Sequence, residues 1–456
     1  MRRKTIQILI GVGILGAGSL SAVNAKAFMD YFQPIPIITP LLSNVWGVPT
    51  VGKRDTANGI EDVTNKNYLY WDGKIFKGAD SAYHIYVSRW AESQGMNGWG
   101  AGVTVQGLSS KNVIGPYIDQ GETWPDNESG KGCNTTGLTL ANGTYVLLVS
   151  ATRPGDLFTA ASLYGPWTYQ GSMKWSDTVE EATNNTTLIQ QPNGDFLGLG
   201  RDGFLFQSAG SVTGPYEGVT VTTTYAQTPS GSVYATIAGS GGSGYDEDPV
   251  IWYSGGYYHI VYNYWGVRKA YHLMSQDGRT NWKYMGLAYD PTTNFVQYTD
   301  GTVNHWYNME RPGVLIENGH VTHFTFAVTD TEKQYIVNNS GHGTKVIVVP
   351  FDGVTFDNDN AGDSITEIMY RGSENRHSIS VRYGAYTINY STNATGNAEF
   401  RLFSMDGKQL GLKHVAILQT SGSFSWQELS TLPAGLYSIY MKVNNSAPVE
   451  NTFIKR

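Results

Sequence analysis

Apolar and polar positions alternate in short runs along most of the chain, and one combination of runs recurs five times. Each copy opens with a polar residue, continues in a short apolar run, turns at Gly, Asn or Asp, and returns in a second run that is usually aromatic. Such alternation between turn residues predicts a β-hairpin. The five copies open at Asp72, Asn134, Asn185, Asp248 and Glu310.

The spacing of the copies predicts how the hairpins are assembled. They start roughly 50 to 60 residues apart, the length that a four-stranded sheet and its loops require. A third and a fourth run follow each of the first four hairpins, joined by a turn at Gly115-Pro116, Gly165-Pro166, Gly214-Pro215 or Asn281-Trp282. Proline has no amide donor, so it suits the entry to an outer edge strand. We therefore expect an all-β fold, a five-bladed β-propeller whose opening residues surround the central axis.

Composition agrees with a large β-rich protein. The 456 residues include 54 Gly, 30 Tyr and 12 Trp, and only 15% are charged. A net charge of −7 gives no sign of nucleic-acid binding. Cys133 is the only cysteine, so it forms no internal disulfide and is expected to be a packed small residue.

The N-terminus has the pattern of a secretory signal. Arg2, Arg3 and Lys4 precede a mainly apolar stretch at residues 8–23, and Ala25-Lys26-Ala27 matches a cleavage site. We expect residues 1–27 to be a signal peptide and the protein to be secreted or placed at a bacterial cell surface. No later apolar stretch approaches the ~20 residues of a membrane helix, so no membrane span is expected in the mature protein.

Composition changes after about residue 370, which predicts a propeller domain at 28–372 and a small β-sandwich at 377–456. The tail resembles the C-terminal sorting domain of the type IX secretion system in three segments: 400–408, 432–439 and 453–456. The resemblance implies that secretion machinery is a partner of this domain. A carbohydrate-binding or spacer sandwich is the alternative.

The front domain resembles the five-bladed propeller glycoside hydrolases of families 43 and 117 over residues 67–350. The motifs that carry the resemblance are Asp248-Pro249 with Gly255-Gly256-Tyr257-Tyr258, the Asp72 opening, Glu310-Arg311-Pro312 and the Gly-Pro-aromatic turns. The resemblance implies a general base at Asp72, a second carboxylate at Asp248 that tunes the acid and orients substrate, and a general acid at Glu310. The placement of Asp248 and Glu310 in adjacent late blades resembles family 117 more than family 43.

Glycoside hydrolysis needs one protonated and one ionised carboxyl, and acids that share a cavity move their pKa values apart. An inverting enzyme, the expected course here, also needs room for water between acid and base. Three acids around one axis could meet these needs. The alternative for each acid is a purely structural role, in which its side chain caps a turn at the start of a strand.

Other residues compete for these roles. Asp246 and Glu247 directly precede Asp248, and strand alternation lets only some of the three face the axis. His305, on the loop before Glu310, could be the proton donor instead. Asp80 is expected at a hairpin turn. The mid-strand histidines are expected in the core or behind the site, and they are His84 and His259.

Arginine and tryptophan side chains are expected at the far ends of the inner hairpins. Because a guanidinium binds carboxylate or sulfate through two parallel hydrogen bonds, a ring of arginines predicts an acidic sugar, whereas pairing with internal acids is the alternative. Tryptophan can stack on sugar rings or pack between blades. The candidate substrate-binding residues are Arg89, Trp90, Arg153, Arg201, Trp265 and Arg268, with Trp99 and Trp306 near the same face.

The expected function is hydrolysis of a plant or algal cell-wall glycan, including acidic or anhydro sugars, with an oligosaccharide or polysaccharide as partner. No dinucleotide, Walker or zinc motif is present, so no cofactor is expected. A structural Ca²⁺ or Na⁺ ion among the axial acids is compatible with their oxygen ligands. The alternatives are a propeller polysaccharide lyase acting on a uronate and a non-catalytic glycan-binding propeller.

Overall fold

The computed structural model describes residues 26–43, 51–109, 111–176, 184–219, 221–222, 227–228, 232–236, 246–360, 378–382, 387–392, 395–404, 408–432, 435–444 and 449–455. The predicted signal peptide lies outside these residues except for its last two. The chain divides into two compact units, Met1–Asn360 and Ala361–Arg456. The predicted domain boundaries at residues 372 and 377 lie outside the described residues and stay predictions.

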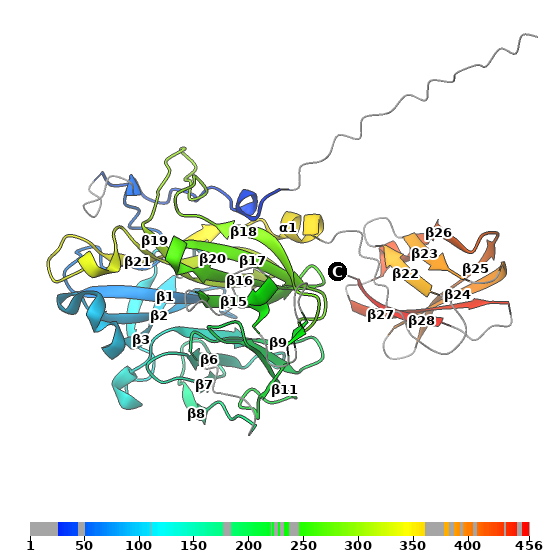
Figure 1. Ribbon diagram of the computed structural model, residues 1–456, viewed down its shortest axis with the longest axis horizontal. Coiled ribbons are helices and arrows are strands. Elements are labelled where there is room, and N and C mark those ends of the chain that lie inside the picture. Colours follow the sequence, from blue (N-terminus) through cyan, green and yellow to red (C-terminus); the bar gives the residue numbers. More distant parts are fainter. Residues whose placement is uncertain are drawn as a thin grey trace, which may run out of the picture. The chain divides into compact units, whose positions relative to one another are not determined.

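Five successive antiparallel sheets make up the first unit (Figure 1). The first sheet is β1 (Tyr68–Lys77), β2 (Tyr83–Ala91), β3 (Val103–Ser109) and β4 (Ile118–Glu122). The second is β5 (Thr135–Thr139), β6 (Tyr145–Val149), β7 (Asp156–Ala160) and β8 (Thr168–Ser172). The third is β9 (Thr187–Gln190), β10 (Phe196–Leu199), β11 (Leu205–Ser208) and β12 (Glu217–Gly218). In each of these sheets the strands are hydrogen-bonded in chain order.

The last two sheets follow a small hairpin of β13 (Val221–Thr222) and β14 (Gln227–Thr228). The fourth sheet is β15 (Asp246–Ser254), β16 (Tyr257–Tyr264), β17 (Lys269–Ser275) and β18 (Lys283–Tyr289). The fifth has three strands, β19 (Asn308–Glu317), β20 (His320–Thr329) and β21 (Thr344–Pro350), and α1 (Gly353–Asn360) comes after it. Short 3-10 segments lie at Phe28–Tyr31, Glu92–Ala101, Glu128–Gly130, Val233–Thr236, Trp265–Val267 and Lys333–Tyr335.

The first strands of the five sheets form a closed cycle. β1 contacts β5, β5 contacts β9, β9 contacts β15, β15 contacts β19, and β19 contacts β1 again. The N-terminal segment joins the outer side of the fifth sheet, because Ile60 pairs with Val346 of β21 and Phe32 pairs with Phe351. A closed cycle leaves the inner strands no free edge, and it brings residues from distant parts of the chain to one axis.

Buried apolar side chains fill the spaces between neighbouring sheets. Trp252 of β15 packs edge-on against Phe324 of β20, and both are fully buried. Leu148 of β6 and Phe206 of β11 belong to one cluster between the second and third sheets. The expected β-rich character is confirmed, since α1 is the one α-helix among the described residues. None of the described helices has the length and apolarity to cross a bilayer.

The second unit contains two antiparallel sheets that share one core. The first is β22 (Ser378–Arg382), β23 (Thr387–Ser391) and β26 (Ser421–Ser425). The second, in bonding order, is β25 (Gln409–Ile417), β24 (Gly396–Ser404), β27 (Gly435–Val443) and β28 (Val449–Lys455). Gln427–Thr431 is a 3-10 segment. Ile388, Phe400 and Trp426 are buried together, so this unit has a hydrophobic core of its own.

Candidate active site

One residue near the start of each inner strand has the left-handed backbone conformation. Its φ angle is 66° at Asp72, 56° at Asn134, 48° at Asn185, 56° at Asp248 and 51° at Arg311. Few residue types other than glycine, Asn and Asp adopt this conformation readily, which explains the polar residue that opens the repeats. The five side chains, here called the axial ring, are all buried.

The expected register of the fifth repeat is wrong by one residue. The β19 bulge lies between Glu310 and Gly313, so that Arg311 takes the ring position and Glu310 precedes it. The β15 bulge lies between Glu247 and Val250 in the same way. Glu310 is thus the counterpart of Glu247. The sequence does carry a signal for this register, because proline follows both Asp248 and Arg311.

Polar contacts link the axial ring all the way round. The backbone amide of Asn134 donates to Asp72 Oδ2 at 2.8 Å, and its side-chain amide donates to Asn185. Asn185 Nδ2 donates to Asp248 Oδ1 at 2.8 Å. Arg311 closes the ring, with Nη1 3.2 Å from Asp248 Oδ1 and Nε 3.0 Å from Asp72 Oδ1. One guanidinium therefore holds two buried carboxylates across the axis.

Asp72 is enclosed within this ring. It is 1% exposed, and it also accepts a hydrogen bond from the Ser88 hydroxyl. Burial raises the pKa of the Asp72 carboxyl, and the charge of Arg311 opposes that rise. Asp72 is also absent from the lining of the cavity described next. Its carboxyl is thus placed to hold inner strands together.

A cavity of about 450 Å³ lies at the ends of the inner strands where the ring residues begin. Six residues that form or directly precede the ring supply its acidic and amide groups, and Trp71, Arg311 and several loop residues supply aromatic and cationic side chains. Its lining consists of Trp71, Met96, Trp99, Asn134, Asn184, Asn185, Arg201, Glu247, Asp248, Glu310, Arg311 and Lys333. We call it the acidic cavity.

Three carboxyl groups meet in the acidic cavity. Three carboxylate oxygens, one from each of Glu247, Asp248 and Glu310, lie within 4.8 Å of one another. A cation contacts each of them, and Arg311 is the partner of Asp248. Lys333 Nζ contacts Glu310 Oε2, and Arg201 Nη2 lies 3.1 Å from Glu247 Oε2. The Lys333 ammonium also lies 4.9 Å from the centre of the Trp71 ring.

Burial and the charges of neighbouring carboxylates raise the pKa values of both glutamates. The pKa of Glu247 is raised to about 8, chiefly by burial and then by the charges of Asp248 and Glu310, which outweigh Lys333 and Arg201. Burial also raises the pKa of Glu310, with the Lys333 charge as the main opposing effect. Two carboxyl groups that repel each other lose their protons in separate steps. Direct contact with Lys333 favours the ionised form at Glu310.

The three carboxyl groups are also the candidate ligands for a hard cation such as Ca²⁺. Polar and cationic side chains of the protein already compensate much of the negative charge of these carboxyl groups. Asp248 accepts hydrogen bonds from Asn185 at 2.8 Å and Asn263 at 3.3 Å, besides its contact with Arg311. Lys333 supplies the positive charge next to Glu310. We assign no metal to this cavity.

Among the residues expected to bind substrate, Arg201 lines the acidic cavity and the other five do not. Arg89 and Arg153 pair with internal acids, Asp119 at 2.8 Å and Asp156 at 2.7 Å, which was the alternative weighed for them. Their charges are thereby neutralised within their own sheets.

The remaining expected substrate contacts also lie elsewhere. Arg268 donates to the Tyr307 carbonyl at 3.0 Å and stacks on the Tyr307 ring. Trp90 is buried and donates to the Gly95 carbonyl at 2.8 Å, whereas Trp265 is 43% exposed outside the lining. His305 Nε2 lies 2.8 Å from Asn294 Oδ1, and His305 is outside the lining of the acidic cavity.

Other expectations about single residues can be compared directly. Asp80 lies in the turn between β1 and β2, as expected. His84 and His259 are buried, and His259 stacks on Trp252 in the core. Cys133 is buried, and burial raises its pKa to about 12, which suits a packed residue rather than a nucleophile.

The sequence patterns did not identify Lys333, Trp71 or Asn184 as site residues. Arg311 was named only as part of the Glu310-Arg311-Pro312 motif. Lys333 lies on a 3-10 turn between β20 and β21, where no repeat or motif marks it. Trp71 and Asn184 each stand one residue before a ring residue. That spacing is the signal that could have found them, once the ring position was known.

No protein-family model and no curated protein sequence matches the chain. Solved structures do show similarity to the chain. A family 43 β-xylosidase/α-arabinofuranosidase from a compost microbial metagenome is 10% identical, with 64% of this chain and 94% of that chain covered and a TM-score of 0.43. A family 117 glycoside hydrolase of the marine bacterium Zobellia galactanivorans is 13% identical, with 65% and 88% covered and a TM-score of 0.40.

An exo-β-1,3-galactanase from Phanerochaete chrysosporium, solved with β-1,3-galactotriose, is 11% identical, with 81% of this chain and 93% of that chain covered and a TM-score of 0.41. Structural neighbours of the chain thus include glycoside hydrolases of families 43 and 117. At these levels of similarity none of their residues assigns a role to a residue of this chain.

Proposed function

We propose that the chain is a glycoside hydrolase with a five-bladed propeller as its catalytic domain, and that Glu247 and Glu310 perform the acid and base chemistry. The observation that carries the proposal is the pair itself: two glutamates on adjacent inner strands that face one cavity, with the pKa of both raised chiefly by burial. The walls add Trp71 and Trp99, aromatic surfaces of the kind that stack on sugar rings.

In this mechanism Glu247 carries the proton and donates it to the glycosidic oxygen as the bond to the anomeric carbon breaks. Glu310, kept ionised by Lys333, stabilises the positive charge that develops on the sugar, and then directs a nucleophile to the anomeric carbon or attacks it. Asp248 keeps the pKa of Glu247 high through its charge. Asp72, first expected to be the base, has a structural role in the axial ring.

The separation of the pair bears on the stereochemical course. One oxygen of Glu247 lies within 4.8 Å of one oxygen of Glu310, whereas whole carboxyl groups are roughly 6.5–9.5 Å apart in inverting enzymes and roughly 5–5.5 Å apart in retaining ones. The inverting course expected from the sequence stays a prediction. Proton NMR of the first-formed sugar anomer distinguishes the two courses.

Glu247→Gln tests the acid. We expect kcat on a natural oligosaccharide to fall about 10²- to 10⁴-fold, because glutamine cannot donate the proton. A dinitrophenyl glycoside of the same sugar needs no proton on its leaving group, so its hydrolysis should change far less. The loss of activity as pH rises through about 8 should also disappear, because that limb reports deprotonation of Glu247. Equal losses on both substrates would exclude Glu247 as the acid.

Lys333→Met tests how Glu310 is kept ionised. Without the ammonium, the pKa of Glu310 should rise further, since Lys333 is the main influence that lowers it. The acid limb of the pH profile of kcat should then move to higher pH by about one unit or more. The matched control is Lys77→Met, which removes an exposed ion pair with Glu317. An unmoved acid limb would contradict the role of Lys333.

The substrate class is proposed as a plant or algal cell-wall glycan, with acidic sugars included because Arg201 faces the cavity. The lyase and glycan-binding alternatives predict different products. A lyase gives an unsaturated sugar that absorbs in the ultraviolet, and a binding protein gives no product. A product assay by mass spectrometry across plant and algal oligosaccharides therefore tests all three functions in one experiment.

We also propose that the protein is exported through its signal peptide and that the second unit acts as a sorting domain for type IX secretion. The sequence patterns of residues 1–27 and of the tail support this. The second unit has its own core, so deletion of residues 361–456 should leave the purified enzyme soluble with unchanged kinetics, yet retain it in the cell envelope of the host. Export of the truncated protein would exclude the sorting role.

A further inference from the structure

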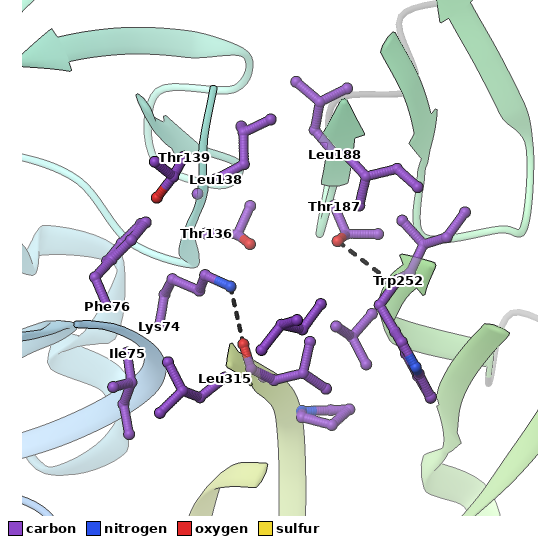
Figure 2. A pocket seen from close by; sticks show the side chains of 18 of the residues that line it. Lys74, Ile75, Phe76, Thr136, Leu138, Thr139, Thr187, Leu188, Trp252 and Leu315 are labelled. Atoms are coloured by element: carbon purple, nitrogen blue, oxygen red, sulfur yellow. Dashed lines mark hydrogen bonds between the residues drawn. The ribbon is translucent and has the colours of Figure 1, made fainter. Parts of the chain in front are cut away.

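A second cavity, of about 540 Å³, lies on the other side of the axial ring, where the five inner strands run on past it. Figure 2 shows its walls, formed by side chains of β1, β5, β9, β15 and β19. Asp248 and Arg311 line both this cavity and the acidic cavity, so the ring separates the two. We call it the lysine cavity, and the proposed hydrolysis makes no use of it.

Four charged residues line the lysine cavity, and three of them are paired. Asp248 and Arg311 contact each other at 3.2 Å in the ring. Lys77, at the outer end, pairs with Glu317 at 2.8 Å. Lys74 is the exception. Within the described part of the chain its ammonium has no carboxylate partner, and its one hydrogen bond goes to the Val314 carbonyl at 2.9 Å.

The ammonium of Lys74 is poorly compensated where it lies. Its side chain points into the cavity (Figure 2), 5.4 Å from the centre of the Phe76 ring. Burial among protein atoms lowers the pKa of Lys74 to about 8, and it is the one cause of that change. An ammonium in apolar surroundings gains free energy from a counter-charge, and the one carboxylate of the walls, Asp248, is already paired with Arg311.

The walls do supply hydroxyl groups. Thr136 of β5 and Thr187 of β9 direct their hydroxyls into the space that the Lys74 ammonium enters (Figure 2). The Thr187 oxygen accepts a long hydrogen bond of 3.5 Å from the Ile251 amide, which leaves its proton free to donate. One ammonium with neighbouring hydroxyl donors is the donor set that a carboxylate or sulfate group accepts.

We propose that the lysine cavity is a binding site for a small oxyanion, a carboxylate or sulfate group held by the Lys74 ammonium and the hydroxyls of Thr136 and Thr187. The anion supplies the missing counter-charge, and its remaining oxygens accept from the threonines. The site lies across the ring from Glu247 and Glu310, so it is independent of the proposed hydrolysis.

Titration of Lys74 in the full-length protein is the first test of the site. Reductive methylation with carbon-13 makes each lysine visible by NMR, and Lys74→Arg identifies the Lys74 signal. Without added anion Lys74 should titrate near pH 8. Saturating sodium sulfate or sodium acetate should raise its pKa by about one unit, a tenfold preference of the anion for the charged amine. Lys77 is the internal control and should not move beyond the salt effect.

A second measurement uses the thermal midpoint. Sulfate stabilises most proteins by exclusion from their surface, so the comparison is between variants. The sulfate-induced rise in Tm should be smaller in Lys74→Met than in Lys77→Met at pH 6.5, and equal in both at pH 10, where Lys74 is neutral. A Lys74 pKa that stays near 8 in both anions, or equal rises in Tm at pH 6.5, would overturn the proposal. Response to acetate alone would restrict the site to carboxylates.

Discussion

Replacement of Glu310 by glutamine should reduce kcat by about 10³-fold or more and leave the fold intact. Glutamine keeps the shape of the side chain but cannot carry the negative charge that stabilises the developing cation and activates the nucleophile. Lys333 would also lose its ionised partner. The measurement is kcat and KM on the oligosaccharide identified by the product assay, with circular dichroism as the check on folding.

Glu317→Gln is the matched control for this variant. Glu317 lies on the same strand, β19, but at its outer end, where it pairs with Lys77. Its replacement should change kcat less than twofold, since the group is remote from the acidic cavity. Retention of most activity by Glu310→Gln, or equal losses in the two variants, would show that Glu310 has no chemical role.

Replacement of Arg311 by methionine should give the largest loss of stability. The change leaves the Asp72 and Asp248 carboxyls buried without the guanidinium that contacts both. Removal of one partner from a buried ion pair costs about 3–5 kcal/mol, and here two acids lose their partner. We expect a fall of several degrees or more in the calorimetric midpoint of the first unit.

The pH dependence of the Arg311→Met variant gives an independent check. Without Arg311 the pKa of Asp72 should rise further, because that cation is the main influence that lowers it. The variant should therefore recover stability as pH falls and the acid becomes neutral. Lys77→Met, which breaks an ion pair at an exposed lysine and should change stability little, is the control. A loss no larger than that control would contradict the structural role of the axial ring.

Much of the architecture was predictable because the repeat is local. Apolar alternation and turn residues predicted the inner hairpins, and the polar residue that opens each repeat coincides with a left-handed position in four of five copies. The fifth copy failed because a carboxylate at Glu310 fitted the chemistry expected there, whereas the bulge places Arg311 at the ring. The chemistry expected at Glu310 thus indicated the wrong ring residue, whereas the proline that follows both Asp248 and Arg311 indicates the correct one.

The division of roles among the acids was not predictable from sequence. Asp72 and Glu247 are both acids near the start of an inner strand, and only contacts from distant segments separate them. Arg311 and Ser88 enclose Asp72, whereas Glu247 faces a cavity with Arg201. Lys333 reaches Glu310 from a connecting loop. Such loop contacts have no period in the sequence, so hydrophobic patterning carries no information about them.

The most direct test of the central claim is hydrolysis in water enriched in oxygen-18, with mass spectrometry of the products from a panel of plant and algal oligosaccharides. The account predicts saturated fragments, with one oxygen-18 atom incorporated for each bond cleaved, and formation of these products at least about 10²-fold more slowly by Glu247→Gln and Glu310→Gln. An unsaturated product without the label, labelled products formed equally well by both variants, or no cleavage of any oligosaccharide in the panel would contradict it.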